Sequence, residues 1–87
     1  MQVTNLEQAF ASFAQTWSPR IVAEINDYDV KIARGAGEFP EHAHPETDEF
    51  FLVLAGTLHL DLPEGTVTLQ AGEACTVPRG VPHRPRA

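Results

Sequence analysis

The sequence predicts an all-β fold, a small barrel or sandwich preceded by one short helix. Three observations lead to this fold class. The apolar pattern changes from helical to strand-like spacing after Pro19, the candidate strands are short, and six Gly and seven Pro separate them. Because 87 residues suffice for one core only, we expect a single domain over residues 1–87, with a helix at 4–17 and the barrel at 20–87.

The helix is expected from a capping box and an apolar stripe. Thr4 and Glu7 have the spacing at which two side chains satisfy the first backbone N–H groups of a helix. Apolar residues then recur every three or four positions as far as Trp17. Ser18-Pro19 should end the helix, because proline disfavours helical geometry at the residue before it.

The strands are expected between turn signals. Asn26-Asp27 should join the first two as a tight turn. The stretch from Glu49 is nearly all apolar, which is typical of a strand covered on both faces, whereas Leu58, Leu60 and Leu62 alternate with polar residues, as in a half-buried strand. The expected strands are 21–25, 28–34, 49–54, 57–62, 66–69 and 74–77.

Composition and charge exclude several classes of partner. A net charge of −6 argues against a nucleic-acid partner, because phosphate binding needs clustered Lys and Arg. The longest apolar run, 50–55, is too short to span a bilayer, so we expect no membrane partner. One cysteine excludes an internal disulfide framework, and no signal peptide is visible. We therefore expect a cytoplasmic protein.

A local basic cluster near the carboxyl end has two interpretations. Arg79, Arg84 and Arg86 lie close to His83 in the sequence. They form either a solvated basic tail, which we favour, or an anion site.

Three of the four histidines lie in loops or at strand edges, and two of them are spaced informatively. His42 and His44 are two positions apart, which places their imidazoles on the same side of an extended chain. Glu49 follows where the next strand begins. Imidazole with carboxylate suits Zn, Mn, Fe, Ni or Cu rather than an all-oxygen Ca or Mg site. An H-x-H pair alone is more often two surface histidines than a metal site.

The wider pattern resembles the cupin superfamily. Its first motif is H-x-H, three or four residues, E, six residues, G, and this chain has His42-x-His44, four residues, Glu49, six residues, Gly56. Its second motif is G, five residues, P-x-G, two residues, H, which here runs from Gly72 through Pro78-x-Gly80 to His83. The 15 residues between the motifs are typical of small single-domain cupins.

The resemblance implies a jelly-roll β-barrel with a metal inside it. Carried over to this sequence, the ligands of one divalent transition metal (Zn, Mn, Fe or Ni) are His42, His44, Glu49 and His83. Asp48 is the competing carboxylate, but strand alternation would point it the other way.

The sequence departs from the family pattern in two places. Gly35 and Gly37 flank the place of a glycine that the first motif has five residues before His42. Ala87 stands where the second motif has Asn. Related small cupins continue into a further strand that closes the barrel, and we expect that closing C-terminal strand to be absent from this chain.

Other candidates have simpler interpretations. We expect His59 to be a solvated strand residue rather than a fifth ligand, and Cys75 to be a small buried hydrophobe rather than a nucleophile. The expected apolar pocket wall consists of Phe39, Phe51, Val53 and Val77.

The cupin fold serves many reactions, so it does not select one. The first hypothesis is a small metalloenzyme, dioxygenase- or isomerase-like, acting on a small oxygenated metabolite. The second is a non-catalytic, metal-dependent ligand-binding or sensor module, and the third is a structural cupin with an empty site. No catalytic residue beyond the metal ligands can be named.

We also expect a homodimer. The strand from Glu49 is apolar on both faces, and an exposed apolar face or an unpaired sheet edge invites a second copy. The alternative is that the apolar stripe of the N-terminal helix covers this face within one chain.

Overall fold

The computed structural model describes all residues from Met1 to Ala87, which divide into two compact units, 1–36 and 37–87. Helix α1, Leu6–Ala11, opens the first unit, and Asn5 caps it by accepting a hydrogen bond from the Gln8 N–H through its side-chain oxygen at 2.9 Å. Thr4 was expected to cap the helix, but its hydroxyl donates instead to the Val22 carbonyl at 3.3 Å.

The helix is shorter than the expected 4–17, and carbonyls at its end and just after it accept hydrogen bonds from outside the helix. The Arg34 guanidinium donates to the carbonyls of Phe10 at 2.7 Å and Phe13 at 3.2 Å, and its charge lies over both aromatic rings. Trp17 has a φ of 53°, a left-handed conformation that no helix continues through. The apolar stripe therefore extends beyond the helix itself.

A β-hairpin completes the first unit. Strands β1, Arg20–Ile25, and β2, Tyr28–Ile32, pair antiparallel, and the expected turn at Asn26-Asp27 is confirmed, with Asn26 at a φ of 57°. Arg34 lies outside β2 and forms a parallel bridge with Thr16.

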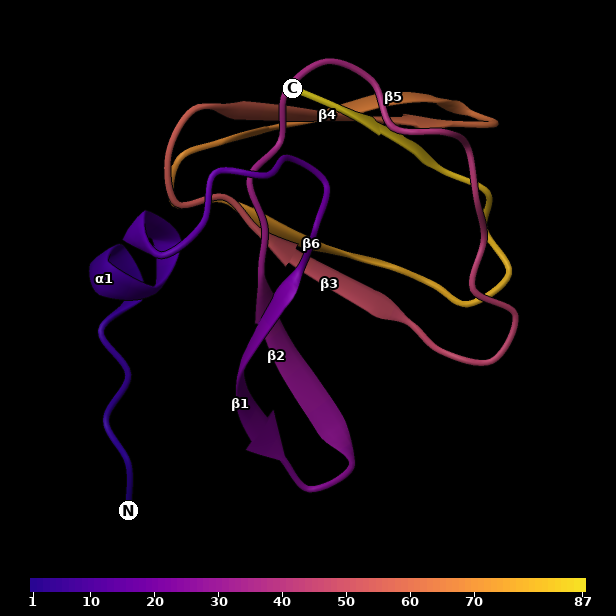
Figure 1. Ribbon diagram of the computed structural model, residues 1–87. Helices are drawn as coiled ribbons and strands as arrows, with labels where there is room; N and C mark the ends of the chain where they lie inside the picture. The colour runs from indigo at the N-terminus through magenta and orange to yellow at the C-terminus, as the bar shows by residue number, and fades with distance from the viewer. The chain divides into compact units, whose positions relative to one another are not determined.

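Five strands form two sheets in the second unit (Figure 1). One sheet pairs β3 with β6, and the other has the order β5-β4-β7. Their bounds are β3 Glu49–Leu52, β4 Thr57–Leu62, β5 Gly65–Gln70, β6 Ala74–Val77 and β7 Arg84–Arg86. The four expected strands of this region are present at nearly the expected positions.

Strand β7 was not expected, and it organises the region of the histidines. One of its edges pairs with β4. Along the other runs the segment 37–42, tied by Gly37 and Ala87 exchanging backbone hydrogen bonds at 2.9 Å and by Phe39 N–H donating to the Pro85 carbonyl at 2.9 Å. In Figure 1 the yellow end of the chain accordingly lies beside this magenta segment.

Two arginines of the basic cluster are part of a strand and share a carboxylate partner, which the interpretation as a solvated tail did not foresee. Arg84 and Arg86 lie in β7, and both donate to the Asp61 carboxylate of β4, at 3.2 and 2.7 Å for their closest contacts. Thr66 Oγ1 donates to the same carboxylate at 2.6 Å. These donors, Arg86 first, hold the pKa of Asp61 well below its usual range.

The core of the second unit consists of apolar residues from both sheets and from the segment that follows β3. Val53, Leu60, Leu69 and Val77 are buried together, and Leu60 is only 1% exposed. The expected alternation of β4 is confirmed, since Leu58 and Leu62 pack against this cluster as well. Strand β3 is not covered on both faces as expected, because Phe50 and Leu52 are 67% and 51% exposed.

No helix of the structure is long and apolar enough to cross a membrane.

Candidate metal centre

His42 and His44 stand on the extended segment that precedes β3. His42 and His83 exchange backbone hydrogen bonds, N–H to carbonyl at 3.0 and 2.8 Å, so two residues far apart in the sequence are held side by side. The Nδ1 of His42 lies 3.0 Å from the Pro40 carbonyl. Because a carbonyl can only accept, Nδ1 carries the proton and leaves the Nε2 lone pair for a ligand.

Glu49 is the first residue of β3, where it pairs with Val77 of β6. Its carboxylate contacts His44 Nε2 and lies 3.6 Å from His83 Nε2. Its neighbour Asp48 faces away from this cluster and contacts Arg79 instead, as strand alternation predicts.

His83 lies at the end of the loop between β6 and β7. Gly80 in this loop has a φ of 79°, a conformation that favours glycine. The His83 side chain is 1% exposed, and its Nδ1 lies 3.0 Å from the Val81 carbonyl. Its Nε2 is buried and has no hydrogen-bond partner.

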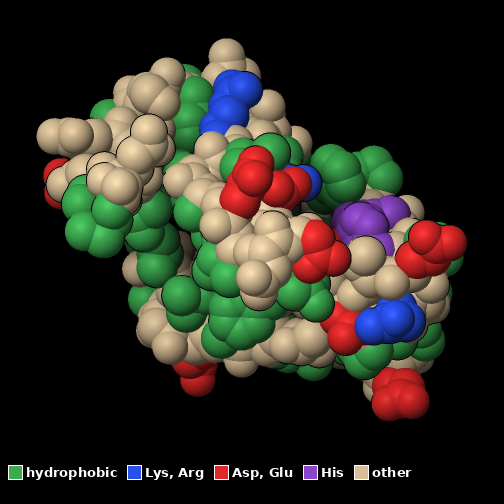
Figure 2. Space-filling view, turned by 90° about the horizontal axis from the view of Figure 1, so that it is seen from below, with side chains coloured by type: hydrophobic (Ala, Val, Ile, Leu, Met, Phe, Trp, Pro, Cys, Tyr) green, Lys and Arg blue, Asp and Glu red, His purple; other side chains and the backbone are tan.

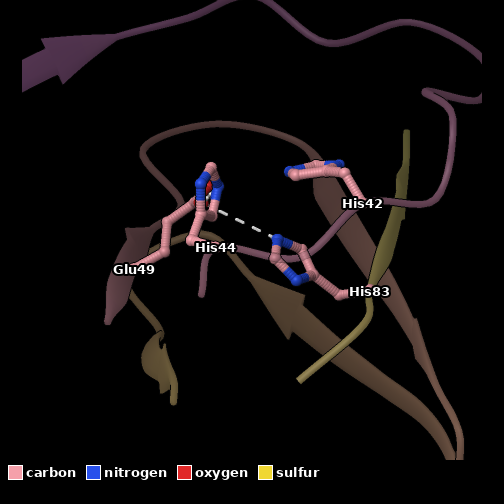
Figure 3. Close-up of side chains that lie close together, drawn as sticks. All are labelled: His42, His44, Glu49 and His83. Carbon is pink, nitrogen blue, oxygen red and sulfur yellow. Dashed lines mark ion pairs between the residues drawn. The ribbon is translucent and has the colours of Figure 1, made fainter. Parts of the chain in front are cut away.

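The structure brings all four residues of the sequence-derived ligand set together. One nitrogen or oxygen atom from each of His42, His44, Glu49 and His83 lies within 4.8 Å of the others. In Figure 3 the three rings and the carboxylate gather around one point, and the dashed line joins His83 to Glu49. The ring centroids of His42 and His83 are 4.3 Å apart.

The donor set fits a transition-metal dication. Three imidazoles and one carboxylate are typical ligands of Zn, Mn, Fe or Ni. The unpartnered Nε2 of His83 supports this fit, because a buried polar atom without a partner costs free energy that a metal bond would offset. With one carboxylate and neutral imidazoles, a dication would leave a local net charge near +1.

The surroundings of the cluster are partly as expected. Phe39 lies edge-on to His42 with centroids 5.3 Å apart, and Phe51 lies edge-on to His83 at 6.0 Å. These two rings therefore form part of a wall around the cluster. Val53 and Val77 belong to the hydrophobic core.

Other expected candidates have structural partners. His59 Nδ1 lies 2.9 Å from Thr68 Oγ1, and His59 is outside the cluster. Cys75 packs against the core, and its partial burial raises the pKa of its thiol, which disfavours a nucleophilic thiolate. Asp48 accepts from the backbone N–H of Arg79, which lowers the pKa of its carboxyl group.

Sequence reasoning missed the groups that orient the ligands. The carbonyls of Pro40 and Val81 fix two imidazole rings, but backbone carbonyls leave no signal in residue identity. Sequence reasoning also missed the contact between Asp48 and Arg79. Strand alternation predicted that Asp48 points away from the cluster, and a carboxylate in that position could have been expected to have another partner.

Comparison with known proteins agrees with this geometry. The family model described as cupin domain matches residues 28–87. A cupin-2 domain containing protein from Shewanella frigidimarina NCIMB 400, of known crystal structure, superposes with a TM-score of 0.95 at 47% identity, over 98% of this chain and 83% of that one. The cupin fold expected from the sequence is thereby confirmed.

Two curated relatives come from Bacillus subtilis (strain 168). The protein YdbB is 39% identical over 67 residues, which are 76% of this chain and 59% of YdbB. Quercetin 2,3-dioxygenase is 40% identical over 55 residues, which are 62% of this chain and 16% of that enzyme. The chain thus spans little more than half of one relative and a small part of the other.

Proposed function

The chain belongs to the cupin domain family, and from this premise we propose that it binds one divalent transition metal and acts as a small metalloenzyme on an oxygenated metabolite. The observation that carries the proposal is the buried, unpartnered Nε2 of His83 facing three other potential ligands. A nitrogen in that position is favourable only if a ligand other than the protein satisfies it.

His42, His44, Glu49 and His83 would hold the metal. When bound, a dication of this kind polarises oxygen-bearing ligands as a Lewis acid. Pro40 and Val81 keep the rings of His42 and His83 turned toward the cluster. Such outer partners are part of what makes a metal site selective and tight.

Part of the site is accessible from solvent. The side chains of His44 and Glu49 are 43% and 32% exposed, and in Figure 2 histidine side chains reach the surface as one purple patch. Four protein ligands would leave two positions of an octahedral metal for oxygen atoms of a substrate or water. Phe39 and Phe51 offer flat apolar contacts beside them.

Part of the chain is similar to a named quercetin 2,3-dioxygenase, and by analogy we propose an oxygenated substrate for the same site. A non-catalytic, metal-dependent binding module is the second candidate. The observation in its favour is that Phe39 and Phe51, which contact the histidine rings, cannot transfer a proton.

Elemental analysis of protein purified without affinity tag or added metal tests the metal site. We expect about one equivalent of Zn, Mn, Fe or Ni, and loss of that metal in His83→Gln. Water proton relaxation with Mn²⁺ bound should show exchangeable water on the metal. Protein that neither carries nor takes up a dication would refute the proposal and indicate a structural cupin with an empty site.

Incubation of the metal-loaded protein with small catechols and enediols separates the two candidates. A dioxygenase-like enzyme adds oxygen to the compound under air and raises its mass, and an isomerase-like enzyme converts it to an isomer of equal mass with a different chromatographic retention time. A binding module returns the compound unchanged in both mass and retention time.

A homodimer belongs to this proposal as well. Phe50 and Leu52 of β3 form an exposed apolar surface that a second copy would cover. The cytoplasmic location stays a prediction.

A further inference from the structure

The four candidate ligands come from three chain segments, which must be held together. The backbone exchange between His42 and His83 fixes two of them. Glu49 stands at the start of β3, and its backbone pairs with Val77 at the last register position of the β3–β6 ladder. Beyond that pair the ladder ends, and the chain enters the loop that carries His83.

Asp48 continues the connection where the ladder ends. Its Oδ1 accepts a hydrogen bond from the backbone N–H of Arg79 at 2.9 Å and another from Arg79 Nε at 3.2 Å. The next N–H along the loop, that of Gly80, donates to the His44 carbonyl at 2.7 Å. Two successive backbone N–H groups of the loop thus donate to Asp48, which precedes the candidate ligand Glu49, and to the backbone of the candidate ligand His44.

From this arrangement we propose that Asp48 is a positioning residue of the metal centre, whose carboxylate fixes the Arg79–Gly80 turn and thereby the separation of Glu49 from His83. Asp48 does not face the cluster and is not itself a ligand. The inference rests on the proposed metal site.

The backbone hydrogen bond, rather than the ion pair, carries the effect. The side chains of Asp48 and Arg79 are 48% and 63% exposed, and an ion pair this exposed contributes little. The backbone N–H is different, because it belongs to the loop itself and has a fixed direction. Removing the Arg79 side chain should therefore matter much less than removing the Asp48 carboxylate.

Affinity for Co²⁺ or Zn²⁺, measured by competition with a chromophoric chelator, tests this on the full chain. Asp48→Ala should bind roughly 10- to 100-fold more weakly than wild type, the range typical of lost outer partners. Asp48→Asn keeps an oxygen acceptor for the Arg79 N–H and should restore most of the affinity. Arg79→Ala should stay close to wild type.

Two controls separate positioning from charge. Asp48→Asn and Asp48→Ala both remove one negative charge, so a purely Coulombic effect would weaken both equally. Glu46→Gln removes a charge from the same loop and should change affinity little. The absorption spectrum of the Co²⁺ form should change in Asp48→Ala and match wild type in Asp48→Asn, because only the former alters the ligand arrangement.

Should Asp48→Ala fail to fold, Asp48→Glu provides the test. It keeps the charge but moves the carboxylate outward by one methylene. If Asp48 positions the loop, the variant should bind metal more weakly; if only its charge matters, the metal affinity should not change. Affinities of Asp48→Ala or Asp48→Glu equal to wild type, or equal losses in Asp48→Ala and Asp48→Asn, would overturn the inference. Failure of wild type to bind metal would instead refute the proposed function.

Discussion

Replacing His44 with Ala should abolish metal-dependent stabilisation while leaving a folded protein. His44 contributes one of four clustered ligand atoms, and its side chain is 43% exposed, so its removal leaves no large buried cavity. The core around Leu60 does not depend on it. Unlike a zinc finger, which unfolds without its metal, this chain should remain folded in chelator.

The size of the expected effect follows from mass action. A ligand at 100 times its Kd stabilises the folded state by about 2.7 kcal/mol. For a domain of this length, about 1 kcal/mol shifts Tm by roughly 4–8 °C. Adding the metal at that concentration should therefore raise the Tm of wild type by roughly 10–20 °C and leave His44→Ala unchanged.

Thermal unfolding followed by circular dichroism, with metal and with chelator, measures both quantities. His59→Ala is the matched control, because it also removes one imidazole but lies outside the cluster, and it should keep the full shift. A metal-dependent shift that survives in His44→Ala would refute the ligand assignment. Loss of all β signal in chelator would show that the apolar core is too small to hold the fold.

Three further predictions concern stability and assembly. Leu60→Ala should destabilise the protein by about 2–5 kcal/mol in urea unfolding, because Leu60 is 1% exposed in the core; a loss below about 1 kcal/mol would contradict that placement. The lowered pKa of Asp61, held by Arg86 first, means that its stabilising effect is complete above the unfolded value of 3.8 and is lost as pH falls through the folded value. In chelator, the Tm advantage of wild type over Asp61→Asn should thus shrink below pH 3.8, whereas a constant difference would argue against the linkage. Light scattering should give twice the 9.5 kDa chain mass, and Phe50→Glu should give the monomer; a monomeric wild type would rule out the dimer.

The sequence predicted the strands of the second unit well because their signals are local. Leu58, Leu60 and Leu62 alternate along β4, and Gly and Pro mark the turns on either side. The short strand β7 was missed because it consists of three residues centred on Pro85, a residue that cannot donate to a ladder. Only its partners, β4 and the segment 37–42, make it a strand.

The site was predictable to a similar degree. Spacing and resemblance named His42, His44, Glu49 and His83, and the structure brings them together. What the sequence could not reveal were the contacts made through backbone groups. The hydrogen bond from the Arg79 backbone N–H to Asp48 is the clearest case, because every residue except proline has a backbone N–H and the residue type therefore does not predict this contact.

The helix shows where local pattern failed. Its stripe continues to Trp17, but Arg34, distant in the sequence, takes the carbonyls of Phe10 and Phe13 that a longer helix would have used. A capping interaction between segments far apart cannot be read from a window of neighbouring residues.

The backbone exchange between His42 and His83 has a consequence for when the protein can acquire metal. The two residues are distant in the sequence, and non-local contacts of this kind form late in folding because loop closure must come first. During synthesis, His42, His44 and Glu49 leave the ribosome well before His83 does, and until His83 follows, the cluster lacks its buried, unpartnered Nε2. Metal loading should therefore coincide with folding of the second unit, so that tightly held metal marks a folded unit rather than starting its folding.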